Sequence, residues 1–354
     1  MVIPTEPIGS IPRPAGLLAA IRDFHAGRIS AATLNGAYDA ALVDTLRRFE
    51  ATGSPVISDG EQRKPSFATY PLVGLPNIAT DGIVVPFADG HTRQLPRLTA
   101  GPFRYSIHAD TYLRAAKGYT GVPVKQAVIS ASALSLLYPA GGVEGYSEAT
   151  FLDDLTAQTA ADIRGCLDAG AHCVQIDFTE GRLAVKLDPS KSLLRRFIAL
   201  NNRVLDQFSA EQRARIGVHT CPGGDRDSTH SADVDYAELL PELFKLQVGN
   251  FYIQLAGEKH PEHALSVIRE YLRPGQRVFV GVIDVLNPDI EEPETVRDRV
   301  IQAAEYIPSE QLGTTDDCGF SPFEDDTSTG RDTAFAKIEA RVLGTKMAAK
   351  ALAT

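Results

Sequence analysis

The sequence predicts an α/β fold, a (β/α)8 TIM barrel, and three observations support this prediction. Short β-rich runs alternate with longer helical patterns, which is typical of βα units around a parallel sheet. The β-rich runs are apolar almost throughout, as expected of strands that helices cover. Polar residues recur at the C-terminal ends of these runs, on the rim where such barrels carry their active sites. The length of 354 residues fits one barrel with insertions, so we assign residues 1–354 to one domain.

The predicted elements follow one another in order along the chain. Strands are predicted at residues 4–10, 55–58, 122–130, 173–177, 216–219, 251–255, 277–284 and 312–315. Helices are predicted at residues 151–169, 193–208, 236–247, 261–272, 294–306 and 332–352. Residues 82–105 break the alternation, because the turn residues Asp89 and Gly90 lie between short apolar runs. This segment predicts a β-hairpin, inserted after the second βα unit, that caps the barrel mouth.

Charge and composition argue against several classes of protein. A net charge of −10 is unfavourable for binding nucleic acid. No apolar run reaches the roughly 20 residues that a membrane-spanning helix needs, and residues 1–6 lack the features of an export signal. Four cysteines in such a chain predict a cytoplasmic protein with free thiols. We expect small-molecule partners, and the sequence leaves open whether the chain forms a homo-oligomer.

Three residues have the chemistry of a metal site. His219 and Cys221 follow the fifth predicted strand, and Cys318 follows the eighth. One imidazole and two thiolates suit Zn²⁺, and the H-x-C spacing lets the first two ligands reach a single point. Three protein ligands leave a fourth position for a substrate, as in catalytic zinc sites. The alternative is a histidine and two cysteines that only pack in the core.

Six motifs occur at the strand ends in a fixed order. They are Ile8-Gly9-Ser10, Asp59-Gly60-Glu61, Val174-Gln175-Ile176-Asp177, His219-Thr220-Cys221, Gly281-Val282-Ile283-Asp284-Val285 and Asp317-Cys318-Gly319. In these motifs the chain resembles the cobalamin-independent methionine synthases over almost its whole length. The resemblance is to their catalytic C-terminal barrel and to short relatives that consist of that barrel alone.

The resemblance implies a bound Zn²⁺ that activates the thiol of homocysteine. His219, Cys221 and Cys318 are the implied zinc ligands. The family has a glutamate as fourth ligand, and its position corresponds to Gln254 in this sequence. Either the amide of Gln254 or the carboxylate of Glu258 is therefore expected to complete the site.

The resemblance also implies a binding site for the amino-acid part of homocysteine. The implied contacts are Ile8, Ser10, Glu61 and Asp177, with Asp177 counted among the catalytic residues. Two carboxylates suit the ammonium group of this substrate. The alternative is that these carboxylates pair with cationic residues on neighbouring loops, for which the candidates are Arg63, Lys64 and Arg182.

Three departures from the family pattern concern the methyl donor. Leu286 stands where the family has the histidine that protonates the departing folate nitrogen, and Phe178 replaces a glutamate. The chain has no tryptophan, so residues 130–135 lack the indole on which the family stacks folate. These departures favour a methyl corrinoid over methyltetrahydrofolate as the donor. A corrinoid can leave without the general acid that is missing at Leu286.

The predicted function is zinc-dependent methyl transfer to a thiol, with homocysteine as the expected acceptor. Metal binding converts a thiol into the nucleophilic thiolate. One alternative is thiol addition to an epoxide, as in the similar epoxyalkane:coenzyme M transferases, although a sulfonated thiol would need cationic contacts. The other is a zinc-bearing, thiol-binding protein without turnover.

Overall fold

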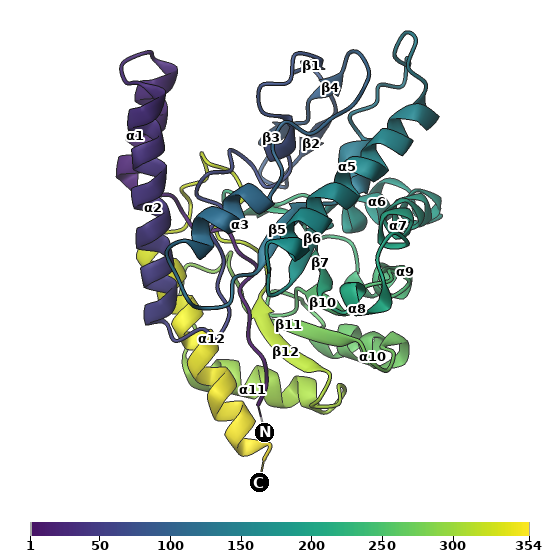
Figure 1. Cartoon of the computed structure of the whole chain (residues 1–354). Helices are drawn as coiled ribbons and strands as arrows, with labels where there is room; N and C mark the ends of the chain where they lie inside the picture. The colour runs from purple at the N-terminus through teal and green to yellow at the C-terminus, as the bar shows by residue number, and fades with distance from the viewer. Residues whose placement is uncertain (1, 354) are drawn as a thin grey trace.

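The structure, a computed structural model, describes residues 2–353 and forms an α/β barrel (Figure 1). A continuous sheet of six parallel strands has the order β12-β11-β10-β7-β6-β5. These strands are β5 (Gln126–Ile129), β6 (Val174–Asp177), β7 (Ile216–Thr220), β10 (Asn250–Ile253), β11 (Arg277–Ile283) and β12 (Leu312–Asp316). Every residue of β5, β6, β7 and β12 is buried, which confirms that these apolar runs are covered on both faces.

Two short segments close the barrel. Thr5 pairs with Thr314 of β12, and Ile57 pairs with Val124 just before β5, both in parallel orientation. The strands expected at residues 4–10 and 55–58 are therefore present in the predicted order but are reduced to single bridging residues. Several prolines in and around these segments lack the N–H group that a longer ladder requires.

Helices surround the sheet. The longer ones are α1 (Ala15–His25), α2 (Ala31–Ala51), α3 (Asp110–Lys117), α5 (Glu148–Asp168), α6 (Glu180–Leu187), α7 (Ser192–Leu205), α10 (Pro261–Tyr271), α11 (Pro293–Ala304) and α12 (Arg331–Ala351). Shorter turns are α4 (Ala131–Ser135), α8 (Ala210–Arg213), α9 (Leu240–Leu243), η1 (Tyr70–Leu72) and η2 (Tyr236–Glu238). Within residues 2–353, no helix combines the length and the apolar character that crossing a bilayer requires.

Most of the predicted helices are confirmed, but the helix predicted at residues 236–247 is wrong as a single element. It is divided into η2 and α9, which meet at Leu239. Pro241 lies in the first turn of α9. Because proline cannot donate a helical hydrogen bond, it starts a new helix more readily than it continues one.

The predicted β-hairpin is present, between β2 (Val84–Pro86) and β3 (Thr92–Gln94), which pair antiparallel. Strands β1 (Ile78–Ala79) and β4 (Arg97–Leu98) extend the insertion. It lies inside the second βα unit, between the segment around Ile57 and helix α3, rather than after that unit. Figure 1 shows the insertion at the end of the barrel opposite the two termini, which is the end that the carboxyl ends of the strands face.

Polar contacts across the barrel position the N-terminal segment. The hydroxyl of Tyr252 on β10 donates to Glu6 at 2.6 Å, and Arg341 on α12 donates to the backbone oxygen of Glu6 at 3.0 Å. Arg341 also pairs with Asp316 at the end of β12 at 2.5 Å, with both side chains buried. The first strand end is thereby fixed beside the last.

Candidate active site and metal centre

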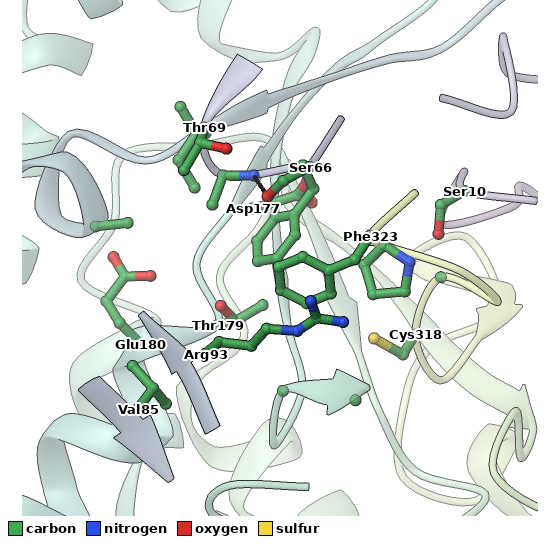
Figure 2. Close-up of a pocket in the computed structure, with 18 of the residues that line it drawn as sticks. Ser10, Ser66, Thr69, Val85, Arg93, Asp177, Thr179, Glu180, Cys318 and Phe323 are labelled. Carbon is green, nitrogen blue, oxygen red and sulfur yellow. Dashed lines mark hydrogen bonds between the residues drawn. The ribbon is translucent and has the colours of Figure 1, made fainter. Parts of the chain in front are cut away.

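A cavity of about 490 Å³ lies at the carboxyl ends of the strands, with residues of the β2–β3 hairpin in its wall. Six predicted site residues also line this cavity: Ile8, Ser10, Glu61, Asp177, His219 and Cys318. They come from five strand ends that are far apart in the sequence. Figure 2 shows three of them, Ser10, Asp177 and Cys318, around the pocket. The remaining predicted site residues, Cys221, Gln254 and Glu258, do not line the wall of this cavity in the described part of the chain.

His219, Cys221 and Cys318 converge at one place. His219 belongs to β7, Cys221 follows that strand directly, and Cys318 lies two residues beyond β12. Their ligand atoms lie within 4.8 Å of one another, and all three residues are buried. The two sulfur atoms are 3.1 Å apart. The barrel closure thus joins two motifs that are separated by about a hundred residues.

The orientation of His219 fits a metal ligand. Its Nδ1 lies 3.3 Å from the backbone oxygen of Tyr252, so Nδ1 carries the proton and Nε2 carries the lone pair. Nε2 is buried and has no hydrogen-bond partner within residues 2–353. The backbone N–H of Gly223 points at the sulfur of Cys221 at 3.4 Å, a contact that suits a thiolate. An unpartnered imidazole nitrogen beside two thiols is a donor set that fits Zn²⁺.

The surroundings of the Cys318 thiol favour its neutral form. A hydrogen bond shared with Cys221, together with burial, holds the pKa of the Cys318 thiol well above its ordinary value. A bound cation would lower the pKa of this thiol, because it stabilises the thiolate. Ionisation of the Cys318 thiol is therefore expected to accompany metal binding.

The two candidates for the fourth ligand have different surroundings. Gln254 directly follows β10, is mostly buried, and has its amide nitrogen beside Gly257. Glu258 forms an ion pair with Arg182, with oxygen–nitrogen distances of 2.6 and 3.2 Å, and is not part of the three-residue group. Asp317 accepts hydrogen bonds from the backbone N–H groups of Leu255, Ala256 and Gly257, so it fixes the loop that begins at Gln254.

Glu61 and Asp177 form the acidic part of the cavity wall. Glu61 accepts a hydrogen bond from Lys64 at 2.9 Å, so one of the ion pairs considered from the sequence is present. Arg63 pairs with Asp39 instead, and Arg182 is engaged by Glu258. Two carboxylates against one lysine leave an excess of negative charge at this wall.

The pKa of Asp177 reflects this environment. Burial raises it to about 6, and repulsion from Glu61 acts in the same direction, whereas His219 and Lys64 oppose the shift. Gln175 donates a hydrogen bond from Nε2 to Asp177 at 2.7 Å and fixes the carboxylate. A ligand ammonium beside Asp177 would relieve the repulsion between the two acids.

The backbone at Glu61 is held in an unusual conformation. Glu61 has a φ of 55°, in the left-handed region that non-glycine residues rarely adopt, and Gly60 before it has a φ of 66°. A Cβ on Gly60 would lie 2.5 Å from Thr45. Asp59 accepts the N–H of Glu61 at 3.0 Å, and Arg13 donates to the backbone oxygen of Glu61 at 2.9 Å. This tight turn directs the Glu61 side chain to the cavity.

Ser10 and Ile8 lie on the first strand segment beside the metal group. A Cβ on Gly319 would lie 2.1 Å from the Ser10 hydroxyl oxygen, so only glycine after Cys318 lets the two loops meet this closely. The hydroxyl oxygen of Ser10 accepts the N–H of Ser321 at 3.2 Å. The backbone oxygen of Ile8 accepts a hydrogen bond from Gln175 at 3.1 Å.

The inserted hairpin is tied to the loops that follow both cysteines. Arg93 on β3 donates to Asp225, which lies in the loop after Cys221, at 2.5 and 3.0 Å. It also donates to Asp325, beyond Cys318, at 3.0 Å. The guanidinium lies over the ring of Phe323, 4.1 Å from its centroid, as Figure 2 shows. Arg93 thus fixes the hairpin across the cavity.

Several residues of the cavity wall were not predicted as site residues. Glu180 lies three residues after Asp177, and the hairpin supplies Val85, Phe87 and Arg93. Glu180 begins α6, two residues after Phe178, and lies outside the strand-end motifs from which the site was predicted. Phe178 itself is buried in the core.

Comparison with known proteins identifies the family of this chain. Residues 3–331 match the family model of the catalytic domain of cobalamin-independent synthases. A methionine synthase of Sulfurisphaera tokodaii is 26% identical over 348 residues, which cover 98% of this chain and 92% of the relative. One from Saccharolobus solfataricus is 22% identical, covering 98% of this chain and 95% of the relative.

Solved structures show the same fold. A B12-independent methionine synthase from Shewanella sp. W3-18-1, in complex with selenomethionine, superposes with a TM-score of 0.77 at 20% identity and covers 100% of this chain and 99% of that chain. A methyltransferase from Methanosarcina mazei gives a TM-score of 0.53 at 11% identity, with 98% and 94% covered. The match over nearly the whole chain shows that this protein belongs to the cobalamin-independent methionine synthase family of methyltransferases, through its catalytic domain.

Proposed function

We propose that this protein catalyses zinc-dependent transfer of a methyl group to the thiol of homocysteine. The observation that carries the proposal is the convergence of His219, Cys221 and Cys318 beside an acidic wall in one cavity. Zn²⁺ held by these three side chains would supply the positive charge that keeps a substrate thiol ionised. The residues that hold the amino-acid part of homocysteine would set the position of its thiol.

The protein's own residues position the acceptor. The carboxylates of Glu61 and Asp177 suit the ammonium group of an amino acid, and the Ser10 hydroxyl lies beside the Cys318 loop. The thiolate lone pair forms the new S–C bond while the bond from the methyl group to the donor breaks, and that electron pair leaves with the donor. The relative from Shewanella is described as a complex with selenomethionine, an analogue of the expected product, which supports this assignment.

The cavity favours a small methyl donor over a methyl corrinoid. A corrinoid must bring a wide macrocycle to the metal group, and the hairpin held by Arg93 occupies that approach. Phe67, Phe87 and Phe323 line the cavity and offer aromatic faces in place of the absent tryptophan. We therefore propose methyltetrahydrofolate, rather than the methyl corrinoid that the sequence favoured, as the donor to test first. Its departing nitrogen takes the electron pair of the broken bond and is protonated by a water molecule, because Leu286 has no proton to give.

Epoxide alkylation with a sulfonated thiol is less compatible with this cavity. Arg93 is the cation that reaches the wall from the hairpin, and two aspartates already neutralise it. A sulfonate would also face the carboxylates of Glu61 and Asp177.

The decisive test is metal content together with X-ray absorption at the zinc edge. We expect about one zinc per chain in wild type and in Cys166→Ser, since Cys166 is a buried cysteine outside the metal group. Cys221→Ser should lose most of the metal, and homocysteine should add a sulfur neighbour to zinc in wild type. A folded wild-type protein that binds no zinc would refute the proposal, and zinc binding without methionine formation from any donor would leave only a thiol-binding protein.

A further inference from the structure

Lys64 is a buried lysine directly behind the acidic wall of the cavity. Only 1% of its surface is exposed, which is rare for a lysine unless a partner holds it. In the described part of the chain, Glu61 and Asp177 line the cavity but Lys64 does not. The ammonium group of Lys64 can therefore influence a bound substrate only through the groups that it holds.

Three partners fix the position of this ammonium group. Nζ of Lys64 donates to Oε1 of Glu61 at 2.9 Å and to the backbone oxygen of Ala127 at 2.9 Å. Nζ also lies over the ring of Tyr70, 4.6 Å from the ring centroid, where a cation is attracted. The hydroxyl of Tyr70 donates to the buried Asp162, which keeps the ring in this place. Lys64 is thus a rigid anchor for Glu61.

Lys64 carries its positive charge in spite of its burial. Burial opposes the charged form, but the carboxylates of Glu61 and Asp59 outweigh burial and raise the pKa of the ammonium group above its ordinary value. Asp59 does not line the cavity among residues 2–353, and burial raises the pKa of its carboxyl group, which favours the neutral form. The cavity wall itself therefore has two carboxylates in front of one lysine.

The two carboxylates of the wall are anchored in different ways. Oε1 of Glu61 is held by the charged Lys64, whereas Oδ1 of Asp177 is held by the neutral amide of Gln175 at 2.7 Å. Oε2 of Glu61 and Oδ2 of Asp177 have no hydrogen-bond partner among residues 2–353. Because both residues line the cavity, these two oxygens are available to a ligand. One ammonium group would balance the single negative charge that remains at the wall.

We propose that Lys64 is a positioning residue that makes the site select thiols carrying an ammonium group, because it holds Glu61 in an ion pair and leaves one net negative charge at the cavity wall. This inference rests on the proposed function, since it explains how the acceptor of that reaction is chosen. Without the lysine, two carboxylates would lie close together in a buried wall. Such a pair takes up a proton and then competes for it with a cationic ligand.

The inference is tested by comparing homocysteine with 4-sulfanylbutanoate, which has the same carbon chain and carboxylate but no amine. The affinity of the zinc-loaded protein for each thiol is measured by isothermal titration. Lys64→Met should weaken homocysteine binding about thirtyfold, as expected when a buried charge-assisted contact is lost, and should leave the affinity for 4-sulfanylbutanoate unchanged. The loss should appear in KM for homocysteine and not in kcat.

A double-mutant cycle tests whether Lys64 acts through Glu61. In the Glu61→Gln protein, Lys64→Met should cause no further loss of homocysteine affinity, because no carboxylate remains to be held. The double variant leaves no unpaired buried charge, so the cycle remains informative even where Lys64→Met alone folds poorly. The matched control is Lys337→Met. Lys337 is also a buried lysine, pairs with Glu291 at 2.8 Å outside the cavity wall, and should leave the preference for homocysteine unchanged.

The outcomes separate this inference from the proposed function. Equal losses of affinity for both thiols would show that Lys64 only supports the fold around the cavity, and this would overturn the inference. Unchanged homocysteine affinity in Lys64→Met, or an undiminished loss in the Glu61→Gln protein, would also overturn it. Failure of the proposed function would instead appear in wild type, as absence of zinc or of methionine formation.

Discussion

The two ends of the cavity differ in how they are built. The thiol end combines His219, Cys221 and Cys318 with the carboxylates of Glu61 and Asp177, at strand ends or on the loops that follow them. The donor end combines an inserted hairpin, apolar side chains and Glu180 at the start of α6. The thiol activation that we propose thus uses residues of the barrel itself, whereas the donor selection that we propose uses added or displaced elements.

The largest effect should come from removing a metal ligand at the thiol end. Cys318→Ser should lower kcat/KM for methionine formation by about a thousandfold or more, because a catalytic metal contributes several kcal/mol to the transition state. The measurement is a discontinuous assay of methionine, with Cys166→Ser as control. A Cys318→Ser enzyme with near wild-type activity would show that the thiol is activated elsewhere.

The acidic wall should give the next largest effect. Asp177→Asn should lower kcat/KM for homocysteine roughly a hundredfold, since a buried charge-assisted contact to the ammonium is lost. Because burial raises the pKa of Asp177 to about 6, homocysteine binding by wild type should strengthen as pH rises through 6. An assay of methionine formation measures the first effect, and isothermal titration with homocysteine across pH 5–8 measures the second. An Asp177→Asn protein with the same binding profile as wild type would contradict the assignment.

A smaller effect is expected at the donor end from opening the hairpin. Arg93→Ala removes the contacts to Asp225 and Asp325. We expect a KM for the donor about tenfold higher and faster hydrogen exchange in residues 84–94, without loss of zinc. Arg97→Ala is the matched control, because Arg97 pairs with Asp81 on the exposed side of the same insertion. Equal exchange in the two variants would show that Arg93 does not hold the hairpin.

The last prediction concerns stability rather than activity and compares the buried acid Glu180 with its uncharged isostere, glutamine. Burial raises the pKa of Glu180 from its ordinary value of 4.5 to about 7 in the folded state, so the folded state binds an extra proton between these pH values. Its contribution to stability is therefore present below pH 4.5 and is lost as pH rises to 7, by up to about 3 kcal/mol. Glu180→Gln should remove this pH-dependent loss. The free energy of unfolding of Glu180→Gln, measured with urea, should therefore rise relative to that of wild type between pH 4.5 and 7. A constant difference would contradict the assigned pKa.

The comparison also explains which parts of the site could be predicted from the sequence. His219-Thr220-Cys221 and Asp177 lie at the carboxyl ends of strands, and parallel strands in a barrel direct these ends to one rim. Their meeting follows from strand order alone. Glu180 and Arg93 required knowledge of side-chain direction and of how the insertion folds over the rim, which periodicity does not report.

Local backbone chemistry accounts for the errors in the predicted elements. Proline prevented long ladders in the first two strands and divided the helix predicted at residues 236–247. The hairpin strands were recognisable from their turn residues, but their place within the second βα unit depended on where α3 begins.

The sequence by itself determined the barrel, the order of its strands, the family and the residues of the thiol end, because these depend on periodicity and on short motifs at strand ends. Only the tertiary structure decided that Lys64 pairs with Glu61, that Glu258 is engaged by Arg182, and that the hairpin is tied to both cysteine loops. These are contacts between loops distant in sequence. They depend on side-chain geometry around a closed barrel, and no local pattern encodes that geometry.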